Sequence, residues 1–285
     1  MKLKEIKLIA LDLDGTVLTD SNTLSDRVKR SLERAIHSGI EVVAASGRPY
    51  GSMPKNVLGI EGLNYSITSN GAAVHDNSGK RIHSTLVSEN DVISLLKITE
   101  EYDLIFEAYV KGLTYTDSRY TANPLKYGCS EAYVDYVKAS HGHIDNMREF
   151  IYNHRKELDS IEIICTNAKK RAHIRQLVED STSGFYITSS SENFIEFMDK
   201  SATKGNAVNW LCNHLDVSKE NTCACGNADN DADMIEQSGF GAAVENASKL
   251  CLDCADIIVP SNNNDGVARL IEIILDKNKQ DSLLN

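Results

Sequence analysis

The chain has 285 residues, of which 41% are hydrophobic and 25% are charged, and its formal net charge at pH 7 is −11. This composition is typical of a soluble globular protein. The acidic balance argues against nucleic acid or an anionic membrane surface as the main partner, because both are recognised by basic patches. The start MKLKEIKLIALD does not have the pattern of a signal peptide. No segment approaches the roughly 20 apolar residues of a membrane span, so we expect a cytoplasmic protein.

The first part of the chain alternates between strand and helix patterns. Residues 6–13 and 40–46 have the continuous apolar character of buried parallel strands, and Ser25 is expected to begin a helix between them. A third short strand is expected at residues 65–68, followed by the turn-rich piece SNGAAVHDNSGK, which favours a hairpin. This order predicts a doubly wound parallel sheet.

From about Ser84 the pattern changes. Ser88 is expected to cap a helix, and the strand-like runs LIFEAYV and GLTYT follow. Further along come SIEIICT, an amphipathic basic helix over about residues 168–179, and the runs GFYITSS and NFIEFMD. Nine of the eleven tyrosines fall between Tyr102 and Tyr186, so this segment has a composition of its own. A separate α+β module inserted into the first one accounts for both features.

After about residue 191 the first pattern returns. KGNAVNWLCNHLDV indicates a helix, and TCACGNADNDADMIEQSG indicates a strand, an acidic loop and a helix. GAAV, DIIV and the helical GVARLIEIILDK complete the pattern. We therefore predict an α/β protein: a doubly wound parallel-sheet core formed by residues 1–83 and 191–285, with an α+β domain of residues 84–190 inserted into it.

The seven cysteines are expected to be reduced thiols. The pairs Cys223/Cys225 and Cys251/Cys254 could in principle form a zinc site, but neither pair is flanked by the turn residues of a zinc knuckle. Burial as small apolar side chains is the better interpretation of TCACG. The HGH sequence that starts at His141 also looks like a metal pair, but in a polar loop we expect it to be exposed.

Four polar clusters follow expected strand ends or begin an expected helix. Ligands of open parallel sheets bind at the carboxyl ends of the strands, so the fold should bring these clusters together. Taken alone, Lys204 has the features of an ordinary solvated lysine. The argument for a functional site therefore comes from the expected meeting of all four clusters. The clusters are Asp12 with Asp14, the run Ser46-Gly47-Arg48, Lys204, and the loop from Asn227 to Asp233.

These stretches resemble a known family. DLDGTVL, AASGR, ATKGNAV and GNADNDADM are similar to motifs one to four of the haloacid dehalogenase superfamily of phosphohydrolases. SNGA, the large insertion and NNDGVARLIE resemble the Cof-like subfamily, which carries a large α/β cap. The resemblance covers nearly the whole chain, and the cap matches by position and general pattern. It implies a Rossmann-like core, a cap that sets specificity, and a Mg²⁺-dependent phosphatase acting on a small phosphorylated metabolite such as a sugar phosphate.

The resemblance also implies residue roles that the chemistry supports. Asp12 would be the nucleophile that forms an aspartyl-phosphate, and Asp14 would act as the general acid and base. Ser46 would hold the transferring phosphoryl oxygens, and Lys204 would add positive charge to the phosphate and to Asp12. The predicted substrate-binding residues are Ser46, Gly47, Arg48, Asn70, Lys204 and Asn230, and the predicted Mg²⁺ ligands are Asp12, Asp14, Asn227 and Asp231.

One position departs from the family pattern. Asn227 stands where the family usually has a metal-binding aspartate, so one negative charge is lost while an amide oxygen remains available. We expect weaker metal affinity with catalysis retained. Two other functions stay open from sequence: a phosphomutase, which shares the aspartyl-phosphate chemistry, and a catalytically silent protein that binds phosphometabolites.

Overall fold

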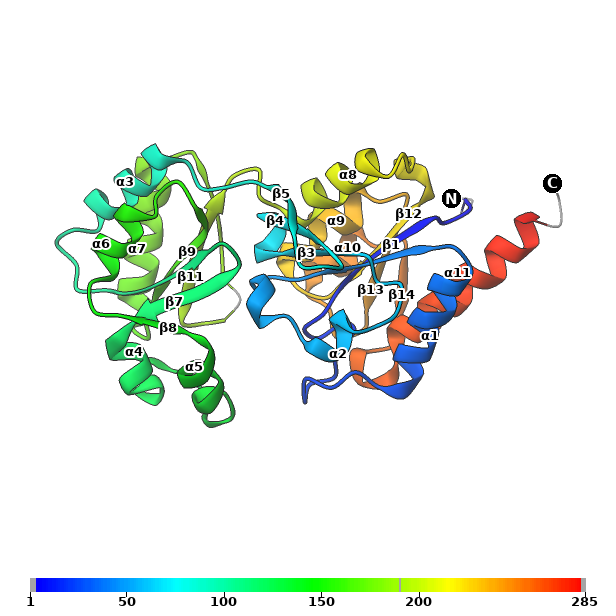
Figure 1. Ribbon diagram of the computed structural model, residues 1–285, viewed down its shortest axis with the longest axis horizontal. Coiled ribbons are helices and arrows are strands. Elements are labelled where there is room, and N and C mark those ends of the chain that lie inside the picture. Colours follow the sequence, from blue (N-terminus) through cyan, green and yellow to red (C-terminus); the bar gives the residue numbers. More distant parts are fainter. Residues whose placement is uncertain (1–3, 190, 283–285) are drawn as a thin grey trace. The chain divides into compact units, whose positions relative to one another are not determined.

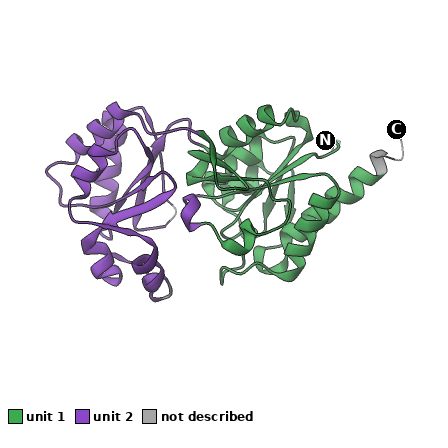
Figure 2. Ribbon diagram, in the orientation of Figure 1, with its two compact units in different colours: residues 1–46, 53–83, 203–285 green, residues 47–52, 84–202 purple. Residues whose placement is uncertain are grey.

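A computed structural model describes residues 4–189 and 191–282 of the chain, which divides into two compact units (Figures 1 and 2). The first unit comprises the chain up to Ser46, the segment Met53–His83 and the chain from Thr203 onward. The second comprises Gly47–Ser52 and Ser84–Ala202. Each unit buries hydrophobic side chains of its own.

The first unit is built on an eight-stranded sheet in the order β14-β13-β12-β1-β2-β3-β4-β5. The pairs from β14 to β3 are parallel, and β4 pairs with β3 in the antiparallel sense, as a hairpin requires. The strands are β1 (Leu8–Asp12), β2 (Glu41–Ala45), β3 (Tyr65–Thr68), β4 (Ala73–Asp76), β5 (Arg81–Ser84), β12 (Thr222–Gly226), β13 (Phe240–Val244) and β14 (Ile257–Val259).

Helices cover both faces of this sheet. Alternate residues of β1 point to opposite faces: Ile9 packs in one core with α1 (Asp26–His37) and α11 (Gly266–Ser282), and Leu8 packs in the other with α8 (Lys204–His214) and α9 (Ala232–Gln237). Two shorter helices, α2 (Lys55–Leu58) and α10 (Lys249–Cys254), complete the unit. The predicted doubly wound sheet is confirmed.

The start of α1 shows how local sequence sets this framework. The Ser25 hydroxyl accepts a hydrogen bond from Val28 N over 3.1 Å, which satisfies one of the free N–H groups in the first turn. Gly39 ends the helix region with a φ of 86°, a conformation that glycine adopts without steric cost. Both positions were expected from the sequence.

The second unit has a six-stranded sheet in the order β10-β11-β9-β6-β7-β8. Its pairs are antiparallel, apart from the parallel pair of β7 and β8. The strands are β6 (Ile105–Val110), β7 (Leu113–Asp117), β8 (Gly142–Ile144), β9 (Leu158–Ile164), β10 (Phe185–Thr188) and β11 (Phe194–Asp199), and the α-helices are α3 (Glu89–Ile98), α4 (Ser118–Ala122), α5 (Val134–Ser140), α6 (Met147–Asn153) and α7 (Ala168–Ser181). The inserted α+β module is therefore present.

The second unit ends later than the sequence suggested. It continues to Ala202, whereas the boundary was expected at residue 190. The reason is β11, which forms antiparallel ladders with both β9 and β10 and so belongs to the second sheet. Because both neighbours of β11 belong to the second sheet, β11 is part of the second unit and not of the first unit that follows it in sequence.

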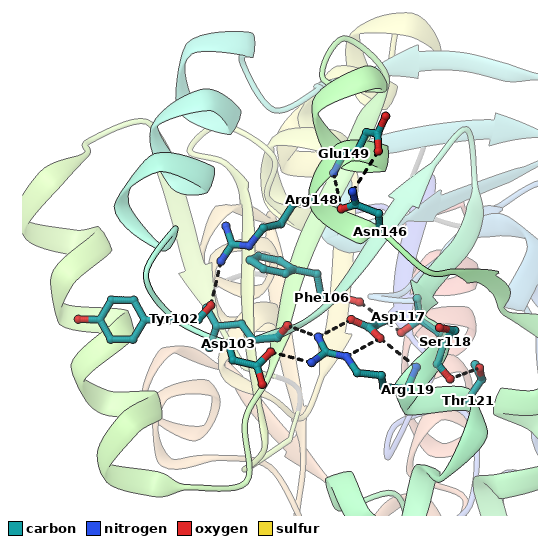
Figure 3. Close-up of polar contacts among 12 residues, drawn as sticks. Tyr102, Asp103, Phe106, Asp117, Ser118, Arg119, Thr121, Asn146, Arg148 and Glu149 are labelled. Atoms are coloured by element: carbon teal, nitrogen blue, oxygen red, sulfur yellow. Dashed lines mark hydrogen bonds and ion pairs between the residues drawn. The ribbon is translucent and has the colours of Figure 1, made fainter.

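Two arginines form networks of polar contacts within the second unit (Figure 3). Arg119 donates to both Asp117 and Asp103. Arg148 donates to the backbone carbonyls of Leu96, Thr99 and Tyr102, near the end of α3, and its guanidinium lies 4.8 Å from the centroid of the Phe106 ring. The partly buried Arg148 thus fixes the end of α3 by hydrogen bonds as well as by packing against Phe106.

Two expectations about metal-binding patterns are resolved within the described residues. All seven cysteines lie there and are free thiols, and Cys223 and Cys225 are buried in β12. The prediction of an exposed HGH loop was wrong for His141, whose side chain is only 8% exposed and whose Nε2 lies 3.5 Å from the buried Glu107 Oε2. None of the helices in the described ranges is both long enough and apolar enough to cross a membrane.

Candidate active site

Four chain segments meet at the carboxyl edge of the first sheet. Asp12 is the last residue of β1 and pairs with Ala45 at the end of β2, directly before Ser46. On the other side, β12 pairs with β1 and ends one residue before Asn227. Parallel strands bring their carboxyl ends to one edge, so the sheet itself assembles these polar residues.

Lys204 joins two carboxylates at the centre of this edge. Its Nζ donates to Asp12 Oδ1 over 2.7 Å and to Asp231 Oδ1 over 2.6 Å. The three side chains are almost fully buried: the residue exposures are 1% for Lys204, 5% for Asp12 and 0% for Asp231. A buried lysine between two aspartates is stable only because each charge has a partner. Considered alone, Lys204 was expected to be a solvated surface lysine, but the tertiary structure buries it.

Burial shapes the acid–base properties of this cluster. Burial, and then the charge of Asp231, raise the pKa of Asp12 to about 7, although the ammonium of Lys204 acts in the opposite direction. Burial alone would lower the pKa of Lys204, but the carboxylates of Asp12 and Asp231 outweigh it and raise that pKa above its ordinary value. Lys204 therefore stays protonated, and additional positive charge near Asp12 would favour its ionised form.

Asp233 fixes the start of the helix that carries Lys204. Its Oδ2 accepts a hydrogen bond from Gly205 N over 3.0 Å, and the Thr203 side chain caps the same helix by accepting from Asn206 N. Burial raises the pKa of Asp233 above its ordinary range. From sequence, Asp233 was only one member of an acidic loop and had no role of its own. The structure makes it a positioning residue for Lys204.

A second group of polar residues lies beside this cluster. Asn70 N donates to Ser46 O over 3.1 Å, and Asn230 Nδ2 donates to Asn70 Oδ1 over 2.7 Å. Gly71 has a φ of 99°, and a Cβ there would lie 2.1 Å from Thr203 O. This loop can therefore approach α8 closely only with glycine at this position. Three predicted substrate-binding residues are thus linked to one another and to the start of α8.

The Asn227 carboxamide lies against three oxygens of the loop that follows β1. With its nitrogen turned toward them, it donates to Asp12 Oδ2 over 3.0 Å, to the Asp14 backbone O over 2.9 Å and to Thr16 Oγ1 over 3.0 Å. Gly15, at a φ of 82°, leaves room for the other end of the carboxamide, since a Cβ there would lie 2.5 Å from the nearest atom of the Asn227 side chain. Thr16 was not singled out from sequence, although it follows directly in the DLDGT run.

The oxygens around Asn227 are suited to a divalent cation. A carboxylate oxygen of Asp12, a carbonyl oxygen of Asp14 and the amide oxygen of Asn227 are the hard donors that Mg²⁺ prefers. Among the described residues, no group of three or more His, Cys, Asp or Glu side chains could hold a metal. Asp231 Oδ2 already accepts from Asn227 N and Ala228 N, and its part in metal binding stays a prediction.

Two of the predicted substrate-binding residues belong to the second unit and not to the first. Gly47 and Arg48 belong to the segment Gly47–Ser52, which clusters with the second unit, and Arg48 Nη1 donates to Ser52 O over 3.4 Å. Their contact with a substrate stays a prediction. Asp14, in contrast, is an exposed residue of the first unit beside the Asn227 amide.

Comparison with known proteins gives a consistent picture. Residues 9–271 match the model of the haloacid dehalogenase-like hydrolases. The chain is 27% identical to phosphatase YwpJ of Bacillus subtilis, over 95% of this chain and 100% of that one, and 25% identical to the 5-amino-6-(5-phospho-D-ribitylamino)uracil phosphatase YcsE of the same species, over 94% and 95%. A haloacid dehalogenase-like hydrolase of B. subtilis with a solved structure is 26% identical, with a TM-score of 0.77 over 94% of this chain and 99% of that one.

Proposed function

The chain belongs to the haloacid dehalogenase-like hydrolases, within the Cof-like subfamily, and on that premise we propose that it is a Mg²⁺-dependent phosphatase of a small phosphorylated metabolite. The observation that carries this proposal is the buried ammonium of Lys204 between Asp12 and Asp231. A phosphate monoester is anionic, so a carboxylate nucleophile needs fixed positive charge beside it.

Hydrolases of this family generally use a divalent metal ion, and we assign the ion here to Mg²⁺. The residues that would hold it are Asp12, Asp14 and Asn227, as their oxygens lie together at the end of β1. A bound cation supplies positive charge that offsets the repulsion between the attacking carboxylate and the phosphate. It would also favour the ionised form of Asp12, whose pKa is raised to about 7 by burial.

The chain's own residues would then carry two successive displacements. In the first, a carboxylate oxygen of Asp12 attacks phosphorus while the bond from phosphorus to the ester oxygen breaks, and Asp14 donates a proton to the departing alcohol. In the second, Asp14 takes a proton from water as the water oxygen attacks phosphorus, and the Asp12 carboxylate is released. Lys204 and Ser46 hold the phosphoryl oxygens throughout. The products are an alcohol and inorganic phosphate.

For the substrate we propose a phosphorylated sugar or sugar alcohol. The side-chain amides of Asn70 and Asn230 are joined by a hydrogen bond next to Ser46, and amides can both donate to and accept from hydroxyl groups. The relative YcsE acts, by its name, on a compound with a phosphorylated ribityl chain. The second unit would supply the remaining specificity contacts.

The test is a panel of phosphate monoesters assayed with Mg²⁺ for release of inorganic phosphate. Asp12→Asn serves as the blank, because its amide still accepts a hydrogen bond from Lys204 but is not a nucleophile. We expect turnover by wild type and loss of at least about a thousandfold in the variant. Equal rates would refute Asp12 as nucleophile. Transfer of phosphate within the substrate without release would identify a mutase, and binding without turnover would identify a silent binding protein.

A further inference from the structure

The carboxamide of Asn227 has complementary neighbours in only one of its two orientations when no cation is bound: with the oxygen inward, that oxygen faces acceptors and the amide nitrogen faces donors. With the nitrogen inward, it donates to Asp12 Oδ2 and to Asp14 O, at 3.0 and 2.9 Å. The Asp14 carbonyl oxygen is an acceptor, and so is Asp12 Oδ2 when its carboxylate is ionised, so this orientation gives each of them a donor. The amide nitrogen then stands where a cation would otherwise balance the oxygens.

With the oxygen inward, only one of the three contacts is still a hydrogen bond. Thr16 Oγ1 can donate to Asn227 Oδ1 over 3.0 Å, but the distances of 3.0 and 2.9 Å to Asp12 Oδ2 and Asp14 O become distances between acceptors. Oxygens that bind Mg²⁺ at about 2.0–2.1 Å in octahedral geometry are about 2.9 Å apart. The oxygen-inward arrangement therefore has the spacing of neighbouring ligands around a divalent cation.

Thr16 allows both orientations. Its hydroxyl is buried, and a hydroxyl can accept from the amide nitrogen or donate to the amide oxygen by rotating its proton. Gly15 lets the amide lie close to the loop on its other side. An ionised aspartate at position 227 would have only acceptor oxygens, so without a cation it would repel the Asp12 carboxylate and would offer the Asp14 carbonyl no donor.

We propose that Asn227 is a switch between a cation-free and a cation-bound site. Without a divalent ion its nitrogen donates to Asp12 and Asp14, and with the ion bound the amide is rotated by about 180° so that its oxygen becomes a ligand. The cation-free site is thereby stable by itself, at the expense of metal affinity. This inference rests on the proposed function only in assuming that a divalent cation binds here.

The test measures Mg²⁺ binding without turnover. Thermal unfolding of the full chain is followed in EDTA and during Mg²⁺ titration for wild type, Asn227→Asp and the exposed control Asn213→Asp, which adds the same charge on α8. We expect Asn227→Asp to melt below wild type in EDTA and to bind Mg²⁺ at least about tenfold more tightly, because cation affinity rises with ligand charge. The control should follow wild type in both conditions. An Asn227→Asp variant as stable as wild type in EDTA, or with unchanged Mg²⁺ affinity, would overturn the proposal.

A second measurement uses the wild-type protein alone. The side-chain amide signals of Asn227 are identified in ¹⁵N NMR spectra by their absence in Asn227→Asp. We expect both protons to shift on saturation with Mg²⁺ and to exchange faster with solvent, because the donors lose Asp12 and Asp14. Unchanged Asn227 signals in a protein whose melting temperature rises with Mg²⁺ would refute the rotation. Neither experiment uses a substrate. Both results can therefore be interpreted even if the activity screen finds no phosphatase activity.

Discussion

Lys204 Nζ donates a hydrogen bond to Asp12 Oδ1 over 2.7 Å, although 192 positions separate the two residues in the chain. The same ammonium also donates to Asp231, so one cation is shared by two buried carboxylates. This relationship links the stability of the first unit to the proposed chemistry, because both need the ammonium in one place.

Lys204→Met should therefore impair stability and activity together. The substitution keeps an apolar stem of similar length but leaves Asp12 and Asp231 buried without a counter-charge, a change that costs about 3–5 kcal/mol in comparable pairs. We expect this loss in urea unfolding, along with a fall in kcat of at least about a hundredfold. The exposed Lys200→Met is the matched control. A kcat within tenfold of wild type would argue against a role for the ammonium in phosphoryl transfer.

Asp233→Ala should lower activity by displacing Lys204. The substitution removes the acceptor for Gly205 N at the start of α8, and small displacements of reacting groups can cost about tenfold to a hundredfold in rate. We expect kcat to fall with a smaller change in KM. Asp233→Asn keeps an acceptor oxygen and should restore most of the rate. If Asn and Ala variants lose activity equally, hydrogen bonding to the helix start is not the cause.

Gly71→Ala and Gly39→Ala form a matched pair, because both glycines have positive φ, at 99° and 86°. A Cβ at Gly39 would meet nothing within 4 Å, whereas at Gly71 it would lie 2.1 Å from Thr203 O. We expect Gly39→Ala to cost about 1 kcal/mol and to leave kcat unchanged. Gly71→Ala should destabilise the first unit further and reduce kcat, as the start of α8 must move. Equal effects of the two substitutions on stability and rate would contradict the close approach.

The second unit should lose stability as the pH rises from about 4.5 to 8. Burial raises the pKa of Glu107 from 4.5 to about 8, so over this range the unfolded chain ionises while the folded chain still holds the proton. A tenfold difference in proton affinity between the folded and unfolded chains corresponds to about 1.4 kcal/mol in the free energy of unfolding, and the full effect would be a few kcal/mol. Glu162 on β9 pairs with Glu107, and Glu196 on β11 pairs with Glu162.

Glu107→Gln should flatten this dependence, and the exposed Glu101→Gln should not. Hydrogen exchange of the β6 amides, followed between pH 5 and 8 with correction for intrinsic rates, measures it. His141 adds an opposite trend at lower pH, because burial lowers its pKa to about 4 and the unfolded chain takes up that proton first. Comparison of wild type with Glu107→Gln isolates the glutamate. A variant with the wild-type pH profile would show that Glu107 ionises normally.

Arg148→Met should destabilise the second unit without affecting the candidate site directly. Its guanidinium donates to three backbone carbonyls near the end of α3, of which the one of Tyr102 is drawn in Figure 3. Methionine leaves those acceptors without that donor. We expect a loss of about 2–3 kcal/mol in urea unfolding. The exposed Lys169→Met should be neutral. An unchanged midpoint for Arg148→Met would show that water replaces the guanidinium without cost.

Much of the framework follows from local sequence. Ser25 and Ser88 cap helices where their spacing predicts it, and the continuous apolar runs of β1 and β12 form buried parallel strands. The boundary of the inserted unit was misplaced because β11 is defined by its pairing with β9 and β10. Strand pairing depends on residues far apart in the sequence, so the local pattern of a strand does not show which sheet the strand joins.

The sequence by itself determined the elements, their order, the family and the residue types that could serve a phosphate site. Those features depend on periodicity, capping and spacing, which act over a few residues. Only the tertiary structure decided that Lys204 is buried against Asp12 and Asp231, that Asp233 holds its helix, and that Asn227 contacts the end of β1. The physical reason is desolvation: a charged or amide group gains a specific partner only once distant segments have excluded water around it.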